Sequence, residues 1–180
     1  LVPLVDENRT FVYQAFKRMK TIHNTGLDAL VQVSGVDTDK LSAGSIGFQI
    51  GPRLNAAGRL GDAKRGVKLF LCEDKEEALH MAEELNKENQ KRREMEAEIT
   101  LMVDEIIQKT IDVESSKVLV VAGQHWHHGV IGIVASRITE KYYRPTILLA
   151  VEDGIASGSA RSVDGFSIFD ALMSCKDLLN

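Results

Sequence analysis

Apolar residues at helical spacing dominate the first 72 positions of the chain. They recur every three or four residues over 7–20, which predicts a short amphipathic helix with Asp6 as its N-cap. A second short helix is expected over 27–34, because Gly35 follows it and glycine commonly ends a helix. This part of the chain is therefore predicted to be helical.

The next apolar segments are interrupted by glycine and proline. A helix is expected from Ser42 to Phe48, and the Gly51-Pro52 pair is expected to stop or turn it, because proline lacks the backbone N–H of a helix interior. Residues 55–60 are mostly small and are punctuated by glycine. Residues 63–71 predict a further helix. Its expected inward side chains are Val67, Leu69, Phe70 and Leu71.

Residues 74–111 are the clearest predicted element, a long helix. They lack glycine and proline, are rich in good helix formers, and begin with Asp74 and Glu77 at capping-box spacing. The stripe is apolar at both ends (Ala78, Ala82, Leu85; Ile99, Val103, Ile106) and polar between them (Asn89, Arg92, Glu96). We expect a helix that is packed at both ends and hydrated over residues 86–98, as in a bridge between two lobes. A coiled-coil segment is the alternative.

After residue 111 the pattern changes to strands alternating with helices. Residues 117–122 are a continuous apolar run, which predicts a strand buried on both faces. The turn signal at Asp153-Gly154 predicts a hairpin between two later strands. The other predicted elements are a helix over 130–141, strands over 145–151 and 155–162, and a helix over 167–179 that begins near Ser167. This β-α-β-β-α order predicts an incomplete α/β lobe.

Composition excludes several classes of protein. The 180 residues are 44% hydrophobic, enough for one domain or two small lobes, and no apolar run or signal peptide indicates a membrane or secreted protein. Cys72 and Cys175 lack metal-ligand spacing, so we expect buried or partly buried thiols in a reducing, cytoplasmic compartment. Without an initiator Met, and ending within a predicted helix, the chain is interpreted as a piece of a longer protein.

Charge is unevenly distributed, although the net charge is only −4. Residues 1–72 carry ten Lys and Arg against six Asp and Glu, a net +4, whereas residues 73–111 carry six against twelve, a net −6. A positive segment of this kind can bind a polyanion on one face.

Three segments have residue types that suit phosphate. In GPRLNAAGRLGDA, residues 51–63, Arg53 and Arg59 flank Asn55, and arginine offers a planar fork to phosphate oxygens. The alternative for this segment is a tight turn between helices with surface arginines.

The second segment, GQHWHHGVIGIVASR, spans residues 123–137. A strand ends here and a helix begins near Gly129, so the first backbone N–H groups of the helix can bind an anion. His127 and His128 can donate to phosphate when protonated or transfer a proton. His125 and His127 would share a face if the strand continued. The alternatives are structural or surface histidines and, more weakly, a zinc site. Trp126 is expected in the core or an interface more than stacked on a base.

The third segment is ASGSARS, residues 156–162. In an extended chain Ser159 and Arg161 point to the same side, and with Ser162 they can form a phosphate pocket. The alternative is a polar hairpin strand at a sheet edge.

These segments, in this order and joined by a helix that contains ELNKENQKRRE, resemble the RecJ branch of the DHH phosphoesterases over essentially the whole chain. The resemblance implies an α/β enzyme. Residues 1–72 would be the C-terminal part of its DHH catalytic lobe, 73–111 the connecting helix, and 112–180 a partial DHH-associated lobe with a mixed sheet. Single-stranded DNA is expected between the lobes.

The resemblance also implies an activity: metal-dependent 5′-to-3′ hydrolysis of single-stranded DNA in recombination and repair, with single-stranded-DNA-binding protein as a family-level partner and no membrane association. Manganese or magnesium is expected in the intact enzyme. The family's DHH motif and metal-binding aspartates are absent from this sequence. We therefore assign no metal ligand, expect no bound metal, and predict that the chain alone is inactive.

The family's substrate-binding residues are carried over only where the motifs match. Ser159, Arg161 and Ser162 match the phosphate-binding GSARS element, Arg53, Asn55 and Arg59 match the motif where catalytic lobe and helix join, and His127 and Gly129 match a Trp-His-x-Gly element. No residue is assigned as catalytic with certainty, and His127 is the candidate. His125 stands where glycine is expected in most relatives.

Two other functions stay open. One is a DHH phosphodiesterase for short oligonucleotides or cyclic dinucleotides, which would carry a Gly-Gly-Gly-His element in place of GSARS. The other is a non-catalytic DNA-binding relative, which the metal-binding aspartates of the upstream sequence would distinguish.

Overall fold

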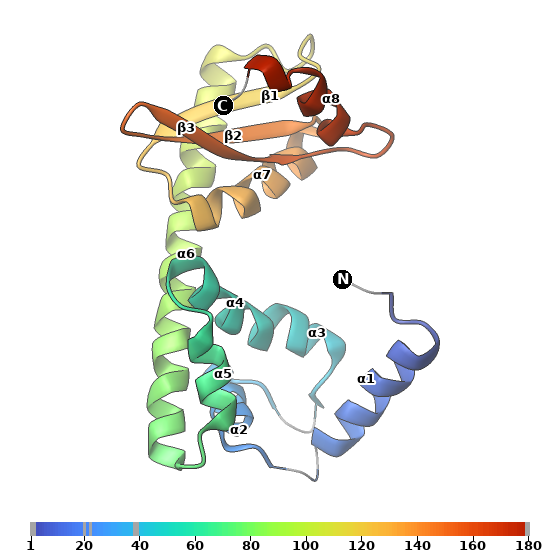
Figure 1. Ribbon diagram of the computed structural model, residues 1–180, viewed down its shortest axis with the longest axis vertical. Helices are drawn as coiled ribbons and strands as arrows, with labels where there is room; N and C mark the ends of the chain where they lie inside the picture. Colours follow the sequence, from blue (N-terminus) through green and yellow to red (C-terminus); the bar gives the residue numbers. More distant parts are fainter. Residues whose placement is uncertain (1–2, 20, 22, 38–39, 179–180) are drawn as a thin grey trace. The chain divides into compact units, whose positions relative to one another are not determined.

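Two compact units share one long helix. The computed structural model describes residues 3–19, 21, 23–37 and 40–178. One unit comprises Leu1–Lys91 and the other Arg92–Asn180, and helix α6 (Lys75–Thr110) contributes to both (Figure 1). The predicted α/β class, with a long helix and a mixed sheet, is confirmed. The finer division into 1–72, 73–111 and 112–180 stays a prediction.

The first unit is helical. Its elements are α1 (Asp6–Met19), α2 (Thr25–Ser34), α3 (Ala43–Ser45), the π-helical η2 (Ile46–Ile50), α4 (Gly51–Leu60), α5 (Lys64–Leu71) and the first half of α6. The apolar core gathers side chains of α2, η2, α4, α5 and α6, which include Leu30, Ile50, Ala57, Leu69 and Leu85.

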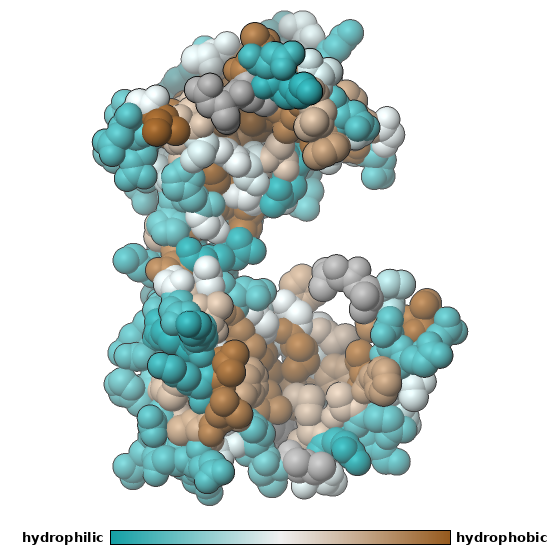
Figure 2. All heavy atoms as spheres, viewed as in Figure 1, coloured by the Kyte–Doolittle hydropathy of each residue, from teal (hydrophilic) through white to brown (hydrophobic). Residues whose placement is uncertain are grey.

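The first two predicted helices are present. Asn24 caps α2, accepting a hydrogen bond from the Leu27 N–H, and Gly35 ends it with φ 67°. Helix α1 matches the predicted 7–20 segment up to Met19, and residue 20 lies outside the described residues. Although its sequence is amphipathic, α1 has no buried residue. Figure 2 accordingly shows hydrophobic surface among the hydrophilic surface of this unit.

The expected stop at Gly51-Pro52 is wrong. The chain stays helical from Ala43 to Leu60. It does so because η2 makes wider hydrogen bonds, such as that from the Gly51 N–H to the Ile46 carbonyl, so that Pro52 falls in the first turn of α4. Proline is tolerated there, since the first N–H groups of a helix need no partner within it.

Helix α5 buries less than predicted. Leu69 is fully buried, but Val67 and Leu71 are 59% and 75% exposed and Phe70 is also exposed. Four apolar residues within five positions cannot all point to one side of a helix, because successive side chains are about 100° apart.

The second unit is a three-stranded mixed sheet with helices. Strand β1 (Leu119–Gln124) is parallel to β2 (Thr146–Glu152), and β2 is antiparallel to β3 (Ile155–Arg161), in the order β1-β2-β3. Helix α7 (His128–Tyr142) connects β1 to β2 and lies along the sheet (Figure 1). Helix α8 (Ile168–Ser174) and the 3-10 turn η3 (Lys176–Leu178) follow β3.

Strand β1 is covered on one face, not on both as predicted. Leu119 and Val121 are buried, whereas Val120 is 50% exposed. The buried residues pair with Thr146 and Leu148 of β2, which are also buried. An apolar run can therefore belong to a sheet whose second face is only partly covered within the described part of the chain.

The predicted hydrated centre of α6 is also wrong. Buried positions continue through the centre at Asn89 and Glu96, which are 5% and 2% exposed. Glu96 forms ion pairs with Arg92, one turn before it, and with Arg137 of α7. The centre is polar because it holds a paired buried charge, which sequence polarity alone does not distinguish from hydration.

Two smaller expectations near the C-terminus need correction. Cys175 is exposed at the end of α8, while Cys72 is half-buried as predicted. The expected 167–179 helix is α8, capped by Ser167, followed by η3, and residue 179 lies outside the described residues. A short helix cannot bury every face, so the thiol at its end stays accessible.

Candidate functional site

Strand β3 presents a polar row to helix α7. Ser157, Ser159 and Arg161 pair across the ladder with Ala150, Leu148 and Thr146 of β2, so they lie on the side of the sheet whose apolar residues are buried. Because side chains of a strand alternate between its faces, Ala156, Gly158 and Ala160 occupy the opposite face. The prediction that Ser159 and Arg161 point to one side is confirmed by their hydrogen bond.

The guanidinium group of Arg161 is held by three hydrogen bonds. Its Nε donates to Ser136 Oγ of α7 at 2.9 Å, and its Nη1 donates to Ser159 Oγ at 3.0 Å and to the Ala160 carbonyl at 2.7 Å. Nη2 donates to no residue that the structure describes, and the side chain is exposed. Arg161 is thus fixed through Nε and Nη1, and the two N–H groups of Nη2 have no acceptor among the described residues, which suits an anion.

His127 acts first as the cap of α7. Its Nδ1 accepts the Gly129 N–H at 3.1 Å, and its carbonyl accepts the N–H groups of Val130 and Ile131. The first backbone N–H groups of α7, which were expected to bind phosphate, therefore donate to His127 instead. Since Nδ1 is an acceptor, the ring proton of neutral His127 is on Nε2, which is the atom left for a substrate.

The segment before α7 does not continue the strand. β1 ends at Gln124, and His125 has φ 61°, so the expectation that His125 and His127 share a strand face is wrong. Trp126 is 5% exposed, which agrees with a core position and leaves no ring face for a base.

Helix α4 divides the arginines of its motif between two faces. Arg53 Nε donates to Asn86 Oδ1 of α6 at 2.8 Å, and Nη1 donates to the Gln49 carbonyl, so this guanidinium joins two helices. Asn55 and Arg59 are four residues apart, which places them on one face of α4, and both are exposed. Only these two are brought together on an exposed face.

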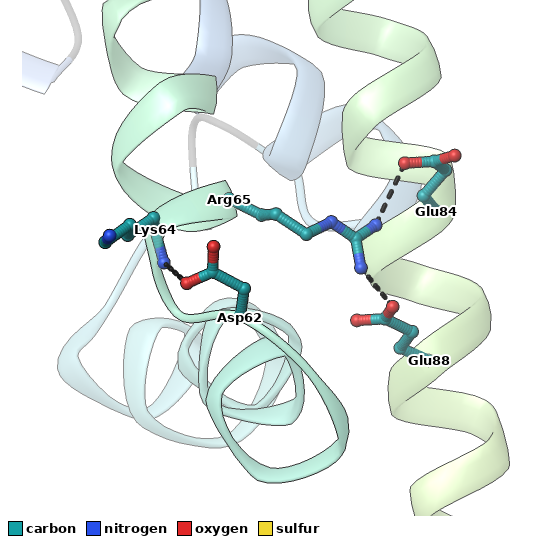
Figure 3. A network of polar contacts seen from close by, with 5 residues as sticks. All are labelled: Asp62, Lys64, Arg65, Glu84 and Glu88. Carbon is teal, nitrogen blue, oxygen red and sulfur yellow. Dashed lines mark hydrogen bonds and ion pairs between the residues drawn. The ribbon is translucent and has the colours of Figure 1, made fainter.

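Sequence reasoning missed a further arginine beside this motif. Arg65 of α5 pairs with Glu84 and Glu88 of α6 (Figure 3). The hydrogen bond from Arg65 to Glu88 is the main cause that raises the pKa of Arg65 above its ordinary value, and Glu84 adds to it. The sequence signal for this pairing was the spacing of Glu84 and Glu88. They lie one helical turn apart, which places two carboxylates on one face of α6, where a single arginine can pair with both.

Ser162 is engaged in its own loop. Its hydroxyl donates to the Phe166 carbonyl at 2.5 Å and so closes the segment between β3 and α8. The structure brings Ser159 and Arg161 together with Ser136, and it places His127 nine residues before Ser136, roughly 13 Å along the axis of α7.

The described residues do not fit a metal ion. No three His, Cys, Asp or Glu side chains gather among residues 3–19, 21, 23–37 and 40–178. Asp62, the carboxylate within residues 51–63, accepts the Lys64 N–H at the start of α5 at 2.9 Å (Figure 3). No helix in the described part of the chain combines the length and apolar composition that crossing a membrane requires.

Comparison with known sequences gives consistent matches. Residues 115–179 match the DHHA1 domain family. The chain is 40% identical over 182 residues to the single-stranded-DNA-specific exonuclease RecJ of Bacillus subtilis, and 40% identical over 179 residues to that of Escherichia coli. These alignments cover 99% and 96% of this chain but only 23% and 30% of the two relatives.

Solved structures agree with the sequence matches. RecJ of Thermus thermophilus in complex with Mg²⁺ is similar with a TM-score of 0.84 and 34% identity, covering 99% of this chain and 27% of that one. An exonuclease RecJ bound to manganese is similar with a TM-score of 0.79 and 35% identity, covering 98% of this chain and 43% of that one.

Proposed function

Because the chain belongs to the RecJ family of DHH proteins, and corresponds to a segment of its members, we propose that it provides phosphate-binding surface for a single-stranded-DNA exonuclease. The observation that carries the proposal is the exposed Arg161, whose Nε and Nη1 donate within the chain while Nη2 donates to no described residue.

An arginine side chain that is already fixed by hydrogen bonds is suited to bind the phosphate backbone of single-stranded DNA. Charge-assisted hydrogen bonds to phosphate are stronger than neutral ones, and a side chain that is already ordered loses less conformational entropy on binding. The contact reads no base, which fits a nuclease that degrades single strands of any sequence.

The other candidate residues receive different support. Asn55 and Arg59 share an exposed face of α4, which favours a second phosphate contact. Arg53 is committed to Asn86 and Gln49, and we propose that it positions α4 against α6. His127 would meet substrate through Nε2, and Gly129 and Ser162 shape the loops beside the site.

We propose the finer function on the resemblance. The whole protein would hydrolyse single-stranded DNA from 5′ to 3′ in the cytoplasm, in recombination and repair, with single-stranded-DNA-binding protein as a partner. Residues 1–72 would complete a catalytic lobe, 73–111 connect it, and 112–180 bind substrate. The Mg²⁺ and Mn²⁺ of the similar RecJ structures have no matching ligand group among the described residues, so no hydrolytic step is assigned to these residues.

Arg161→Ala tests the phosphate contact. Binding of a 5′-fluorescein-labelled oligothymidylate to the 180-residue chain is measured by anisotropy at several salt concentrations. We expect a roughly tenfold weaker Kd and a salt slope smaller by about 0.7, the value for one phosphate of a single strand. Arg161→Lys should restore part of the affinity, because lysine keeps the charge but lacks the fork.

Lys117→Ala removes an exposed positive charge from the same unit and is the matched control. Equal effects of Lys117→Ala and Arg161→Ala would indicate a general charge effect and contradict a specific site at Arg161.

The chain alone is expected to be inactive. Incubation with 5′-labelled single strands and Mn²⁺ should release no mononucleotide, because the described residues hold no carboxylate cluster to bind the metal and activate water. Release that co-purifies with the chain, and that Arg161→Ala diminishes, would refute this prediction.

A further inference from the structure

Ser136 of α7 connects the helix backbone to Arg161. Its hydroxyl donates to the Gly132 carbonyl, one turn earlier, at 3.2 Å. A hydroxyl has one proton to donate, so this bond directs the oxygen lone pairs away from the helix backbone. Arg161 Nε donates to that same oxygen at 2.9 Å. The orientation of the guanidinium is therefore set by a hydroxyl that is itself oriented.

Gly132 of α7 lies beside Nη2 of the same guanidinium. A Cβ atom at Gly132 would lie 3.0 Å from Arg161 Nη2 and 3.0 Å from Ser159 Oγ, which is tighter than nine in ten real contacts of a Cβ. The two polar groups thus converge on the bare backbone of one helical residue. Glycine is unfavourable inside a helix compared with alanine, so its presence here is explained by this close approach.

Gly132 and Ser136 are four residues apart on α7. The residues that they contact, Ser159 and Arg161, are two residues apart on β3. A helix advances about 6 Å over four residues and a strand about 6.6 Å over two, so the two spacings match closely. Gly132 is consequently beside Ser159 while Ser136 is beside Arg161.

We propose that Ser136 and Gly132 position Arg161 to bind a phosphate group of single-stranded DNA. Ser136 holds Nε so that Nη2 lies beside Gly132, and Gly132 leaves the space in which a phosphate oxygen reaches Nη2 and Ser159 Oγ. The proposal rests on the proposed function of Arg161, and it adds that the affinity of Arg161 depends on these two residues of another element.

A double-mutant cycle tests the role of Ser136. Ser136→Ala is measured for oligothymidylate binding by the 180-residue chain, alone and combined with Arg161→Ala. We expect an affinity loss of about three- to tenfold in the wild-type background and none in the Arg161→Ala background, since a residue that acts through Arg161 cannot act without it. Ser136→Thr keeps the hydroxyl and should restore most of the affinity.

Gly132→Ala separates positioning from folding. Alanine is the better helix former, so thermal unfolding should shift little or upward, while the affinity for oligothymidylate should fall about threefold or more, again only when Arg161 is present. Gly47→Ala is the matched control, because a Cβ at Gly47 would meet nothing within 4 Å. It should leave binding unchanged.

The outcomes distinguish the two proposals. If Arg161→Ala weakens binding but Ser136→Ala and Gly132→Ala do not, the positioning role is refuted and the proposed function stands. Equal losses from Ser136→Ala with and without Arg161 would indicate a merely structural role and also refute it. If Arg161→Ala leaves Kd unchanged, the proposed function fails at this site and the positioning role fails with it.

Discussion

His125 is a residue in a backbone conformation that its side chain disfavours. Its φ of 61° lies in the left-handed region, where a Cβ atom approaches the carbonyl oxygen. The strain is tolerated because β1 must end at Gln124 and the chain must reverse before Trp126 is buried and His127 caps α7.

We expect His125→Gly to stabilise the second unit by about 0.5–1 kcal/mol, because glycine adopts this φ without the steric cost. Urea unfolding followed by the fluorescence of Trp126, the single tryptophan of the chain, measures the change. Gln124→Gly, one residue earlier in extended backbone, should instead destabilise by a similar amount. A loss of stability in His125→Gly would mean that the imidazole makes a contact that outweighs the strain.

Only some residues of the candidate site could be predicted from the sequence. Strand alternation was enough to place Ser159 and Arg161 on one side. It could not find Ser136 or Gly132, because their role depends on how α7 packs along β3. Nor could it separate Arg53, which joins helices, from Arg59 on the exposed face, since both are arginines of one short motif.

Among the elements, α6 was predicted with nearly correct ends and an incorrect centre. Lack of glycine and proline, with a cap at Asp74 confirmed by its bond from the Glu77 N–H, was sufficient for the helix. The buried charge of Glu96 was not predictable, because its partner Arg137 is 41 positions away in the sequence. The same limit applies to η2. Local propensity predicts that the helix stops at Pro52, whereas the wider hydrogen bonds of η2 let the helix continue through Pro52.

A second contact of α6 with α7 gives a pH dependence. Lys141 and Tyr142 donate to Asp104 Oδ1 at 2.5 and 2.6 Å, and these hydrogen bonds, that of Lys141 foremost, hold the pKa of Asp104 below its ordinary value. A carboxyl whose pKa is lower when folded stabilises the fold above its unfolded pKa of about 4. That contribution is lost as pH falls through the folded pKa.

Asp104→Asn should therefore be less stable than the wild type at neutral pH, and the difference should shrink on acidification from about pH 5 to pH 2. Thermal unfolding midpoints across this range provide the measurement. Glu105→Gln is the control, because the Glu105 side chain is 68% exposed and, among the described residues, forms an ion pair with Lys109 alone. Its difference from the wild type should be small at every pH. A constant gap between Asp104→Asn and wild type would exclude ionisation of Asp104 as the cause.

At the scale of the whole molecule, each unit has its own core and α6 is continuous between them. The order of strands and helices after residue 111 was predictable, because each segment has its own periodicity and a turn signal divides β2 from β3. The partly covered face of the sheet was not predictable, since it depends on what packs against β1 and not on the strand's own residues.

Lys91→Pro tests whether the two cores unfold as one. Lys91 is exposed at the division between the units, and proline inside a helix costs about 3 kcal/mol or more. The buried residues on either side, such as Leu85 and Ile99, are untouched. We expect thermal unfolding of the variant, followed by circular dichroism, to separate into two transitions.

Lys91→Ala should keep the wild-type profile, because alanine favours the helix. A single transition at the wild-type midpoint in Lys91→Pro would show that the continuity of α6 does not couple the cores.

The alternation of strand β3 constrains how the length of this sequence can change. One residue inserted between Ile155 and Arg161 would reverse every later side chain of the strand, so that alanines and glycine faced α7 and Arg161 faced away. A second insertion would restore the original direction. Over evolutionary time, gains and losses inside this strand are therefore confined to even steps. The turn at Asp153-Gly154 lies outside the ladder and is free to lengthen by one.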